Sequence, residues 1–206
     1  MVDISLQNIG KKFRKNWVLK DINLEIKKGS RTAVLGPNGS GKSTLLQIIS
    51  SMTLPTEGKI THYRNGEKLE GDSVYKYISY AAPYLELLET LTLMESIDLH
   101  GKFKAWSGGL DTERIIDLLE LNKQRNQQLT EFSSGMKQRL KLGLTLLSDV
   151  SLVLLDEPLT NLDEKGRLWY RDMIEEFGKE KTFVVCSNHQ EEEYDFCEGM
   201  LSLQAI

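Results

Sequence analysis

The amino-acid sequence predicts an α/β fold with a mainly parallel core sheet, an antiparallel β edge and a small helical lobe. Short segments with alternating apolar residues occur near the N-terminus, which is typical of antiparallel strands. Apolar runs alternate with helical segments towards the C-terminus, as in β-α-β units of a parallel sheet. The residues between about 84 and 147 have helical spacing and predict the helical lobe.

The antiparallel edge is predicted by the first strands of the chain. Ile4 and Leu6 alternate with polar residues, and so do the apolar residues between 22 and 26. Residues 27–30, Lys-Lys-Gly-Ser, have the composition of a turn between strands. Asn65-Gly66 marks a second turn, which precedes an apolar strand at 78–81.

A glycine-rich loop follows the apolar residues 33–35 and precedes a helix that we expect from near Lys42 to Met52. The glycines let the backbone turn tightly and direct N–H groups at phosphate oxygens, while a helix N-terminus favours negative charge. In this pattern Lys42 reaches the β and γ phosphates, Ser43 offers a hydroxyl to Mg²⁺, and Thr44 supports the α phosphate. The pattern predicts a P-loop NTPase whose loop binds a nucleoside triphosphate through Gly36, Pro37, Asn38, Gly39, Ser40, Gly41, Lys42, Ser43 and Thr44.

Two helices are expected in the lobe. Asp111 has the position of an N-cap before a helix whose apolar face includes residues 115–119, and residues 136–147 carry a second apolar stripe. We interpret residues 106–110 as a loop that leads into the Asp111 cap. The leucines between 85 and 93 are interpreted mainly as core, with a groove for a membrane partner as the alternative.

Two acids end a buried strand in the C-terminal third of the chain. Strands are expected at 151–155 and 182–186, with a helix at 164–177 between them. Asp156 and Glu157 then lie at the carboxyl edge of the sheet, where ligands collect. Asp156 is suited to hold Mg²⁺, and Glu157 could polarise an attacking water. The alternative for either acid is a helix N-cap or a solvated strand end.

Composition excludes several classes of protein. The chain has 206 residues, which we expect to form a single domain, residues 1–206, with a helical subdomain at about 84–147 inserted in the α/β core. The longest apolar run falls far short of the roughly 20 residues that a membrane-spanning helix needs. The net charge of −4 disfavours nucleic acid as a partner, although a local basic patch is compatible with it. Two cysteines and no signal peptide predict a cytoplasmic protein with reduced thiols.

These motifs, in this order, resemble the ATP-binding subunits of ABC transporters over nearly the whole chain. By that resemblance residues 36–44 form the Walker A loop, Asp156 and Glu157 the Walker B pair, and residues 161–163 the D-loop. His189 matches the switch histidine that steadies the γ phosphate, whereas His62 and His100 are interpreted as surface residues. Phe13 sits where the family stacks an aromatic ring on adenine, and Trp17 is a weaker candidate.

The signature motif and the Q-loop depart from the family pattern. Residues 132–136 read Phe-Ser-Ser-Gly-Met where the commoner form is Leu-Ser-Gly-Gly-Gln. A helix N-terminus there is still a competent anion site, so Ser133, Ser134 and Gly135 are expected to meet ATP bound to a second copy, with Asp163 organising the opposite site. Pro83 replaces the glutamine that links Mg²⁺ to the helical lobe, which puts the efficiency of turnover in question.

The resemblance implies an ATPase that powers an ABC transporter through nucleotide-driven dimerisation, with ATP and Mg²⁺ as cofactors and Lys42, Glu157 and His189 as catalytic residues. It implies a second ATP-binding subunit, a separate transmembrane permease and a position at the inner face of the membrane. The compact length resembles export-type cassettes. A soluble ABC-type ATPase and a weakly hydrolysing regulatory subunit are the alternatives. The sequence identifies neither the transported substrate nor the permease, and it leaves the direction of transport and homodimer versus heterodimer open.

Overall fold

The computed structural model describes residues 2–205, which form two compact units. The first unit contains the residues up to Tyr80, Val150–Glu157 and the residues from Glu180 onward. The second unit contains Ala81–Asp149 and Pro158–Lys179.

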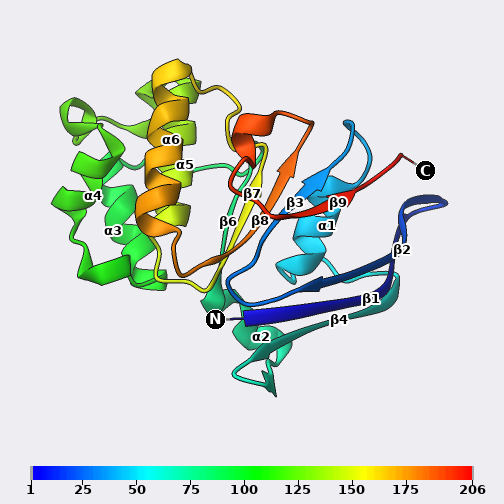
Figure 1. Ribbon diagram of the computed structural model, residues 1–206. Helices are drawn as coiled ribbons and strands as arrows, with labels where there is room; N and C mark the ends of the chain where they lie inside the picture. The colour runs from blue at the N-terminus through cyan, green and yellow to red at the C-terminus, as the bar shows by residue number, and fades with distance from the viewer. Residues whose placement is uncertain (1, 206) are drawn as a thin grey trace. The chain divides into compact units, whose positions relative to one another are not determined.

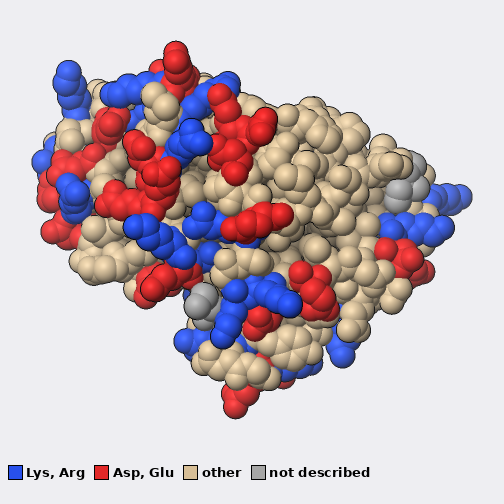
Figure 2. Space-filling view, in the orientation of Figure 1, with Lys and Arg blue, Asp and Glu red and all other residues tan. Residues whose placement is uncertain are grey.

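An antiparallel sheet forms one layer of the first unit. Its strands lie in the order β2-β1-β4-β5, with β1 (Val2–Phe13), β2 (Asn16–Ile26), β4 (Glu57–Arg64) and β5 (Glu67–Lys68). Ile4 pairs with Ile26 and Leu6 pairs with Leu24, so the predicted antiparallel pairing is confirmed. Asn65 and Gly66 both have positive φ and join β4 to β5, which confirms the second predicted turn. Lys and Arg side chains gather at the hairpin end that joins β1 to β2 (Figure 2).

A second, mainly parallel sheet has the strand order β6-β7-β8-β3-β9. Strand β3 pairs in parallel with β8 and β9, and β7 pairs in parallel with β8. This arrangement confirms the predicted α/β fold class. The strands of β7 and β8 are buried along their whole length, as expected for a parallel sheet covered on both faces. Their bounds are β3 (Arg31–Leu35), β6 (Ile78–Ala81), β7 (Leu152–Asp156), β8 (Thr182–Ser187) and β9 (Gly199–Ser202).

Helix α1 (Lys42–Ile49) holds the core of the first unit together. Its buried leucines and isoleucines belong to one apolar cluster with residues of β1, β3, β7 and β8. In Figure 1 the helix lies between the antiparallel sheet and β3. The expected end at Met52 is wrong, because Ser50 caps the helix and Met52 is exposed. Because β3 and α1 pack in the same core, the C-terminal end of β3 and the N-terminus of α1 hold the two ends of the glycine-rich loop.

Four helices make up most of the second unit: α3 (Leu93–Phe103), α4 (Thr112–Leu119), α5 (Ser134–Leu146) and α6 (Glu164–Phe177). Asp111 caps α4 by accepting a hydrogen bond from the N–H of Arg114, as predicted. Residues 106–110 lead into this cap through a short 3-10 turn, which confirms their interpretation as a loop. Short elements complete the chain: α2 (Gly71–Val74), η1 (Tyr75–Tyr77), η2 (Ser107–Gly109), η3 (Asn122–Gln124), η4 (Leu129–Glu131) and η5 (Glu191–Glu193).

Two interpretations of apolar and histidine residues are wrong. Of the leucines between 85 and 93 only Leu93 is fully buried, and Leu88 is 63% exposed, because the segment after Pro83 forms turns rather than a packed helix. His62 is buried and its Nε2 lies 2.7 Å from the carbonyl of Ile49. His100 is half-buried and its Nε2 lies 2.8 Å from Ser148 Oγ. Within residues 2–205, no helix has the length and apolarity to cross a membrane.

Candidate functional site

The glycine-rich loop connects β3 to α1 in the first unit. Gly39 and Gly41 have φ values of +84° and +94°, which an L side chain rarely adopts. Gly41 is also the N-cap of α1, so the first N–H groups of the helix point out of the loop. The backbone thus has the curvature and the free donors that phosphate oxygens require.

Two glycines of the loop are packed so closely that no side chain fits there. A Cβ on Gly36 would lie 2.5 Å from the carbonyl oxygen of Leu203 and 2.6 Å from Ser40 Oγ. A Cβ on Gly41 would lie 2.8 Å from a Leu19 methyl group and 2.9 Å from the carbonyl oxygen of Val18. Strand β2 therefore packs directly against the loop.

Lys42 lies inside the loop and is only 5% exposed. Its Nζ donates hydrogen bonds to the carbonyl oxygens of Gly36 at 2.8 Å and Pro37 at 3.2 Å. The same Nζ lies 3.7 Å from Glu157 Oε1. The loop thus folds around the Lys42 ammonium group, and the Glu157 carboxylate lies at ion-pair distance from it.

Asp156 and Glu157 lie at the carboxyl end of β7. Asp156 is 2% exposed and stands opposite Cys186 of β8. Glu157 has a φ of +44°, and its N–H donates to the carbonyl oxygen of Cys186 at 2.9 Å. This left-handed residue turns the chain sharply, so that the Glu157 carboxylate faces Lys42 while the Asp156 carboxylate stays buried.

Cys186 forms the floor of this group of residues. Its thiol donates to the carbonyl oxygen of Lys42 at 3.5 Å, at the start of α1. Complete burial raises the pKa of the Cys186 thiol well above its usual value, and the negative charges of Asp156, Glu157 and Glu193 raise that pKa further. The thiol is therefore a neutral packing group, and three carboxylates place negative charge beneath the loop.

The remaining candidates of the first unit lie at the ends of strands. His189 follows β8 by two residues, is exposed and has a φ of +60°. Phe13 ends β1 and is 50% exposed, with Lys11 Nζ 5.0 Å from the centre of its ring. Trp17 instead packs over Gly10, where an added Cβ would lie 3.0 Å from its ring. Phe13 has the more accessible ring of the two aromatic candidates.

The donors at the loop suit Mg²⁺ and a triphosphate. Ser43 in the first turn of α1 and Asp156 supply the hydroxyl and carboxylate oxygens that a hard cation prefers. Within the described residues no group of three or more His, Cys, Asp or Glu side chains could hold a metal ion. A cation that keeps several waters and binds phosphate oxygens needs only one or two protein ligands, so the residues fit such an ion.

The signature segment and the residues 161–163 form a second group, in the second unit. Ser133 caps α5 by accepting a hydrogen bond from the N–H of Met136 at 3.2 Å, and Asp163 caps α6 in the same manner at 2.8 Å. A Cβ on Gly135 would lie 3.0 Å from the carbonyl oxygen of Asn161. The N-termini of two helices of 13 and 14 residues thus begin side by side.

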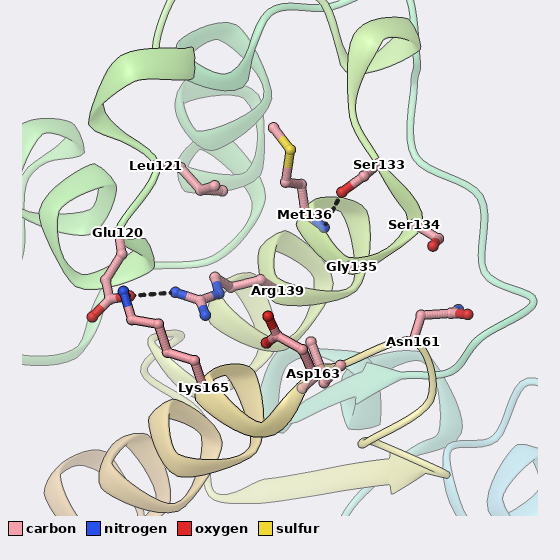
Figure 3. A pocket seen from close by; sticks show the side chains of 11 residues that line it. Glu120, Leu121, Ser133, Ser134, Gly135, Met136, Arg139, Asn161, Asp163 and Lys165 are labelled. Atoms are coloured by element: carbon pink, nitrogen blue, oxygen red, sulfur yellow. Dashed lines mark hydrogen bonds and ion pairs between the residues drawn. The ribbon is translucent and has the colours of Figure 1, made fainter.

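These residues line a cavity of about 470 Å³ (Figure 3). Three further charged side chains, Glu120, Arg139 and Lys165, also line the cavity. Glu120 Oε2 accepts from Arg139 at 2.7 Å and lies 3.1 Å from Lys165 Nζ. These two cations lower the pKa of the Glu120 carboxyl. Arg139 belongs to the Lys-Gln-Arg run at 137–139 that follows the signature segment, and this run is the local sign of the cluster in the sequence. Glu120 and Lys165 come from distant parts of the chain and carry no such sign.

Pro83 lies in the turn after β6, and its carbonyl oxygen is a hydrogen-bond acceptor. Lys141 of α5 donates to Pro83 O at 2.7 Å and to Ala82 O at 3.4 Å. Desolvation by burial, followed by the charge of Lys137, lowers the pKa of Lys141. The turn is thus held to α5 through its backbone, at the residue where the family pattern has a glutamine.

Comparison with protein families and curated proteins gives a consistent result. The family described as ABC transporter matches residues 19–160. An uncharacterised ABC transporter ATP-binding protein, YybJ of Bacillus subtilis (strain 168), is 30% identical, and the alignment covers 97% of this chain and 92% of YybJ. The Nod factor export ATP-binding protein I of Rhizobium johnstonii is 30% identical over 99% of this chain and 67% of its own length. The sulfate/thiosulfate import ATP-binding protein CysA of Mesostigma viride is 34% identical over 92% of this chain and 56% of its own length.

Solved structures share the fold. The ATP-binding cassette MJ0796, in a dimeric post-hydrolysis state bound to ADP and Pi, superposes with a TM-score of 0.81 at 26% identity. The superposition covers 98% of this chain and 96% of that cassette.

Proposed function

The chain belongs to the ABC transporter family, and from this we propose that it is the ATP-binding and ATP-hydrolysing subunit of an ABC transporter. The observation that carries the proposal is the buried Lys42 within a loop whose glycines adopt positive φ between β3 and α1. Such a loop has few uses other than holding phosphate groups. The ADP and Pi found in the MJ0796 cassette support the same ligand class.

In the proposed mechanism Lys42 leaves the carbonyl oxygens of its own loop and binds the β and γ phosphates. Glu157, which lies 3.7 Å from Lys42, orients and polarises the attacking water. His189 steadies the γ phosphate, and Phe13 stacks on adenine. Mg²⁺, held by Ser43 and Asp156, would offset phosphate charge. Because phosphoryl transfer requires little covalent chemistry from the protein, positioning and charge stabilisation account for the rate.

We infer that the active form is a dimer in which each ATP touches two chains. The loop residues 36–44 of one copy would bind the nucleotide, and Ser133, Ser134 and Gly135 of the second copy would contact its γ phosphate. Asp163 would organise the opposite site. The two helix N-termini that begin beside the cavity support this role, because both favour a bound anion. The chain would act as one ATP-binding domain with a helical subdomain at about 84–147.

The transport partner is proposed to be a separate transmembrane permease, which would hold the chain at the inner face of the membrane. Export is the direction we propose, and the relative named for Nod factor export supports it. The relative named for sulfate and thiosulfate import is similar in identity, so uptake and efflux of substrate in vesicles must be compared directly.

Calorimetry with ATP and Mg²⁺ tests the nucleotide site. We expect binding by the wild-type chain and a loss of at least about 100-fold in affinity for Lys42→Ala, since the removed cation faces the phosphates. Unchanged affinity in Lys42→Ala would contradict the loop assignment. The second candidate function is a weakly hydrolysing regulatory subunit, and the observation that favours it is Pro83 in place of the family's glutamine. Steady-state release of phosphate by the wild-type chain distinguishes the two candidates.

A further inference from the structure

The end of the β1–β2 hairpin carries a concentrated positive charge. No Asp or Glu occurs between Gly10 and Asp21, and the cations there are Lys11, Lys12, Arg14, Lys15 and Lys20. The net charge of the chain is −4, so the other residues together carry −9. Arg14, Lys15 and Lys20 are exposed, and Lys11 and Lys12 are half-buried. Figure 2 shows this group of basic side chains at the right-hand edge of the view. We call residues 11–20 the basic hairpin.

Two cations of the basic hairpin contact uncharged groups. Lys11 Nζ donates to the carbonyl oxygen of Leu54 at 2.8 Å, and Lys12 Nζ lies 5.3 Å from the centre of the Trp17 ring. None of the five cations takes part in the ion pairs found within residues 2–205. Asp21 is bonded to the amide groups of Asn8 and Asn23, and Glu57 lies opposite Gly10 in the sheet.

The basic hairpin adjoins the phosphate loop within the first unit. Val18 and Leu19 pack against Gly41, at distances that leave no room for a Cβ there. Lys12 pairs with Trp17 and Phe13 pairs with Asn16, so the cations at 12–15 lie only a few residues along the strands from this contact. At about 3.3 Å per residue, the offset along the strands from Val18 is roughly 3–13 Å. That is about one Debye length or less at 0.1 M salt, where the length is about 10 Å.

The floor of the loop has the opposite charge. Asp156, Glu157 and Glu193 are close enough to Cys186 to raise its pKa, and Lys42 is the one cation that lowers it. At short range these carboxylates oppose the approach of a nucleoside polyphosphate, whereas Lys42 and the N-terminus of α1 favour it. The basic hairpin carries positive charge on both sides of the solvent-exposed residue Phe13 in the chain.

We propose that the basic hairpin is a steering surface that guides nucleoside polyphosphates to the loop of residues 36–44. The inference rests on the proposed function and specifies how the nucleotide reaches the site. Steering acts on the encounter, because a field that extends over several ångströms raises the association rate of an oppositely charged ligand. Steering by itself leaves the dissociation rate unchanged, because it requires no contact between the cations at 12–15 and the bound phosphates.

The test is a pair of matched triple variants. Lys12→Gln/Arg14→Gln/Lys15→Gln removes three charges from the basic hairpin and leaves Phe13 in place. The control, Lys27→Gln/Lys28→Gln/Lys68→Gln, removes three exposed charges at the opposite end of the same sheet, where Ile26 pairs with Ile4 and Lys68 pairs with Tyr63. Both variants change the net charge equally, so they separate the position of the charge from its amount.

Stopped-flow mixing with a ribose-labelled fluorescent ATP analogue measures the two rates at about 20 mM and about 500 mM salt. We expect the hairpin variant to associate roughly 3–10-fold more slowly at low salt and within about 2-fold of wild type at high salt, where screening is strong. Dissociation rates should be equal in all proteins, and the control should associate like wild type. Arg14→Glu/Lys15→Glu should slow association further, because it reverses the sign of the charge.

Four results would overturn steering. They are an unchanged association rate in the hairpin variant, a slower rate that persists at high salt, an equal effect in the control, and a faster dissociation that indicates direct contact. Binding of the wild-type chain to anionic lipid vesicles that disappears in the hairpin variant, with ATP association unchanged, would assign the surface to a membrane instead. Failure of the wild-type chain to bind the analogue would contradict the proposed function itself, which distinguishes the two failures.

Discussion

Two residues to which we assign hydrolysis have an unusual backbone. Glu157 and His189 adopt φ values of +44° and +60°, in the left-handed region that non-glycine residues rarely occupy. Such conformations cost on the order of 1–3 kcal/mol each and persist where the surrounding structure enforces them. For Glu157 that enforcement includes the hydrogen bond from its N–H to Cys186 O. Both residues follow strands of the parallel sheet, so the strain lies at the carboxyl edge that faces the phosphate loop.

Glu157→Gln should retain ATP binding and lose hydrolysis. The amide has nearly the shape of the carboxylate but cannot polarise a water, while Lys42 and the loop amides still bind the phosphates. We expect turnover to fall at least about 100-fold and the affinity for ATP to stay within roughly 3-fold. Phosphate release and calorimetry measure the two quantities. Turnover equal to that of wild type would exclude Glu157 from this role.

His100 should make the second unit sensitive to acid. Its ring stacks on Trp106 with 5.0 Å between centroids, and Ser148 Oγ, which accepts from His100, donates its own proton to Leu144 O. Burial, followed by the charge of Lys104, lowers the pKa of His100 to about 4. Because the unfolded chain takes up this proton near pH 6.5 and the folded chain does not, stability is retained above pH 6.5 and lost between pH 6.5 and 4.

His100→Gln removes that titration and keeps an amide donor for Ser148. Urea unfolding at pH 7.5 and at pH 4.5 gives the loss of unfolding free energy on acidification for each protein. This loss should be about 2–3 kcal/mol smaller in the variant than in wild type. His62 and the carboxylates contribute equally to both proteins and cancel in the comparison. An identical loss in both proteins would mean that His100 is protonated in the folded state.

At the scale of elements, local chemistry made several boundaries predictable. The Asp111 cap and the helix at 164–177 follow from capping residues and apolar spacing, which act within one or two turns. The structure of residues 84–92 could not be predicted in this way, because the leucines have helical spacing and yet the segment forms turns. Backbone hydrogen bonds such as Leu129 N–H to Leu91 O hold that segment in place, and these tertiary contacts cannot be read from spacing.

Lys141 and Lys137 lie one turn apart on α5 and should differ in their effect on stability. Lys141 is half-buried and bonded to the carbonyl oxygens of Ala82 and Pro83, whereas Lys137 pairs with the exposed Glu89 at 2.6 Å. Lys141→Met should cost about 1–2 kcal/mol, because it leaves two carbonyls without a charged donor. Lys137→Met should cost less than about 1 kcal/mol.

Urea unfolding of the two single variants measures this difference. Lys141→Arg serves as the conservative control, since it keeps a cation that can reach the same carbonyls. Equal stability of Lys141→Met and Lys137→Met would show that the turn at Pro83 does not depend on the Lys141 contact.

At the scale of the whole molecule, the candidate residues fall into two groups. One group surrounds Lys42 in the first unit, and the other surrounds the cavity between α5 and α6 in the second. Local motifs in the sequence predict the residues of both groups, and their roles stay predictions. The sequence could not identify the contact of Glu120 with Arg139 and Lys165, because these residues come from separate helices and meet only in the folded unit. His62 and His100 were misjudged for the same reason, since long-range packing determines their burial.

In the proposed dimer each active site combines the phosphate loop of one copy with the signature segment of another. A mixture of two inactive variants tests this arrangement. Lys42→Ala disables the loop, and Ser134→Glu places a carboxylate in the exposed first turn of α5, where it favours the helix dipole but repels a triphosphate. In a mixed dimer one composite site carries both defects and the other carries neither.

Phosphate release from an equal mixture of the two variants is therefore the decisive measurement. We expect each variant alone to be inactive and the mixture to recover activity. The recovered activity should not exceed that of the mixed dimers present, each of which has one intact site. If mass spectrometry detects mixed dimers and the mixture is as inactive as its components, the two chains do not share active sites. Both motifs of each site would then lie in a single chain.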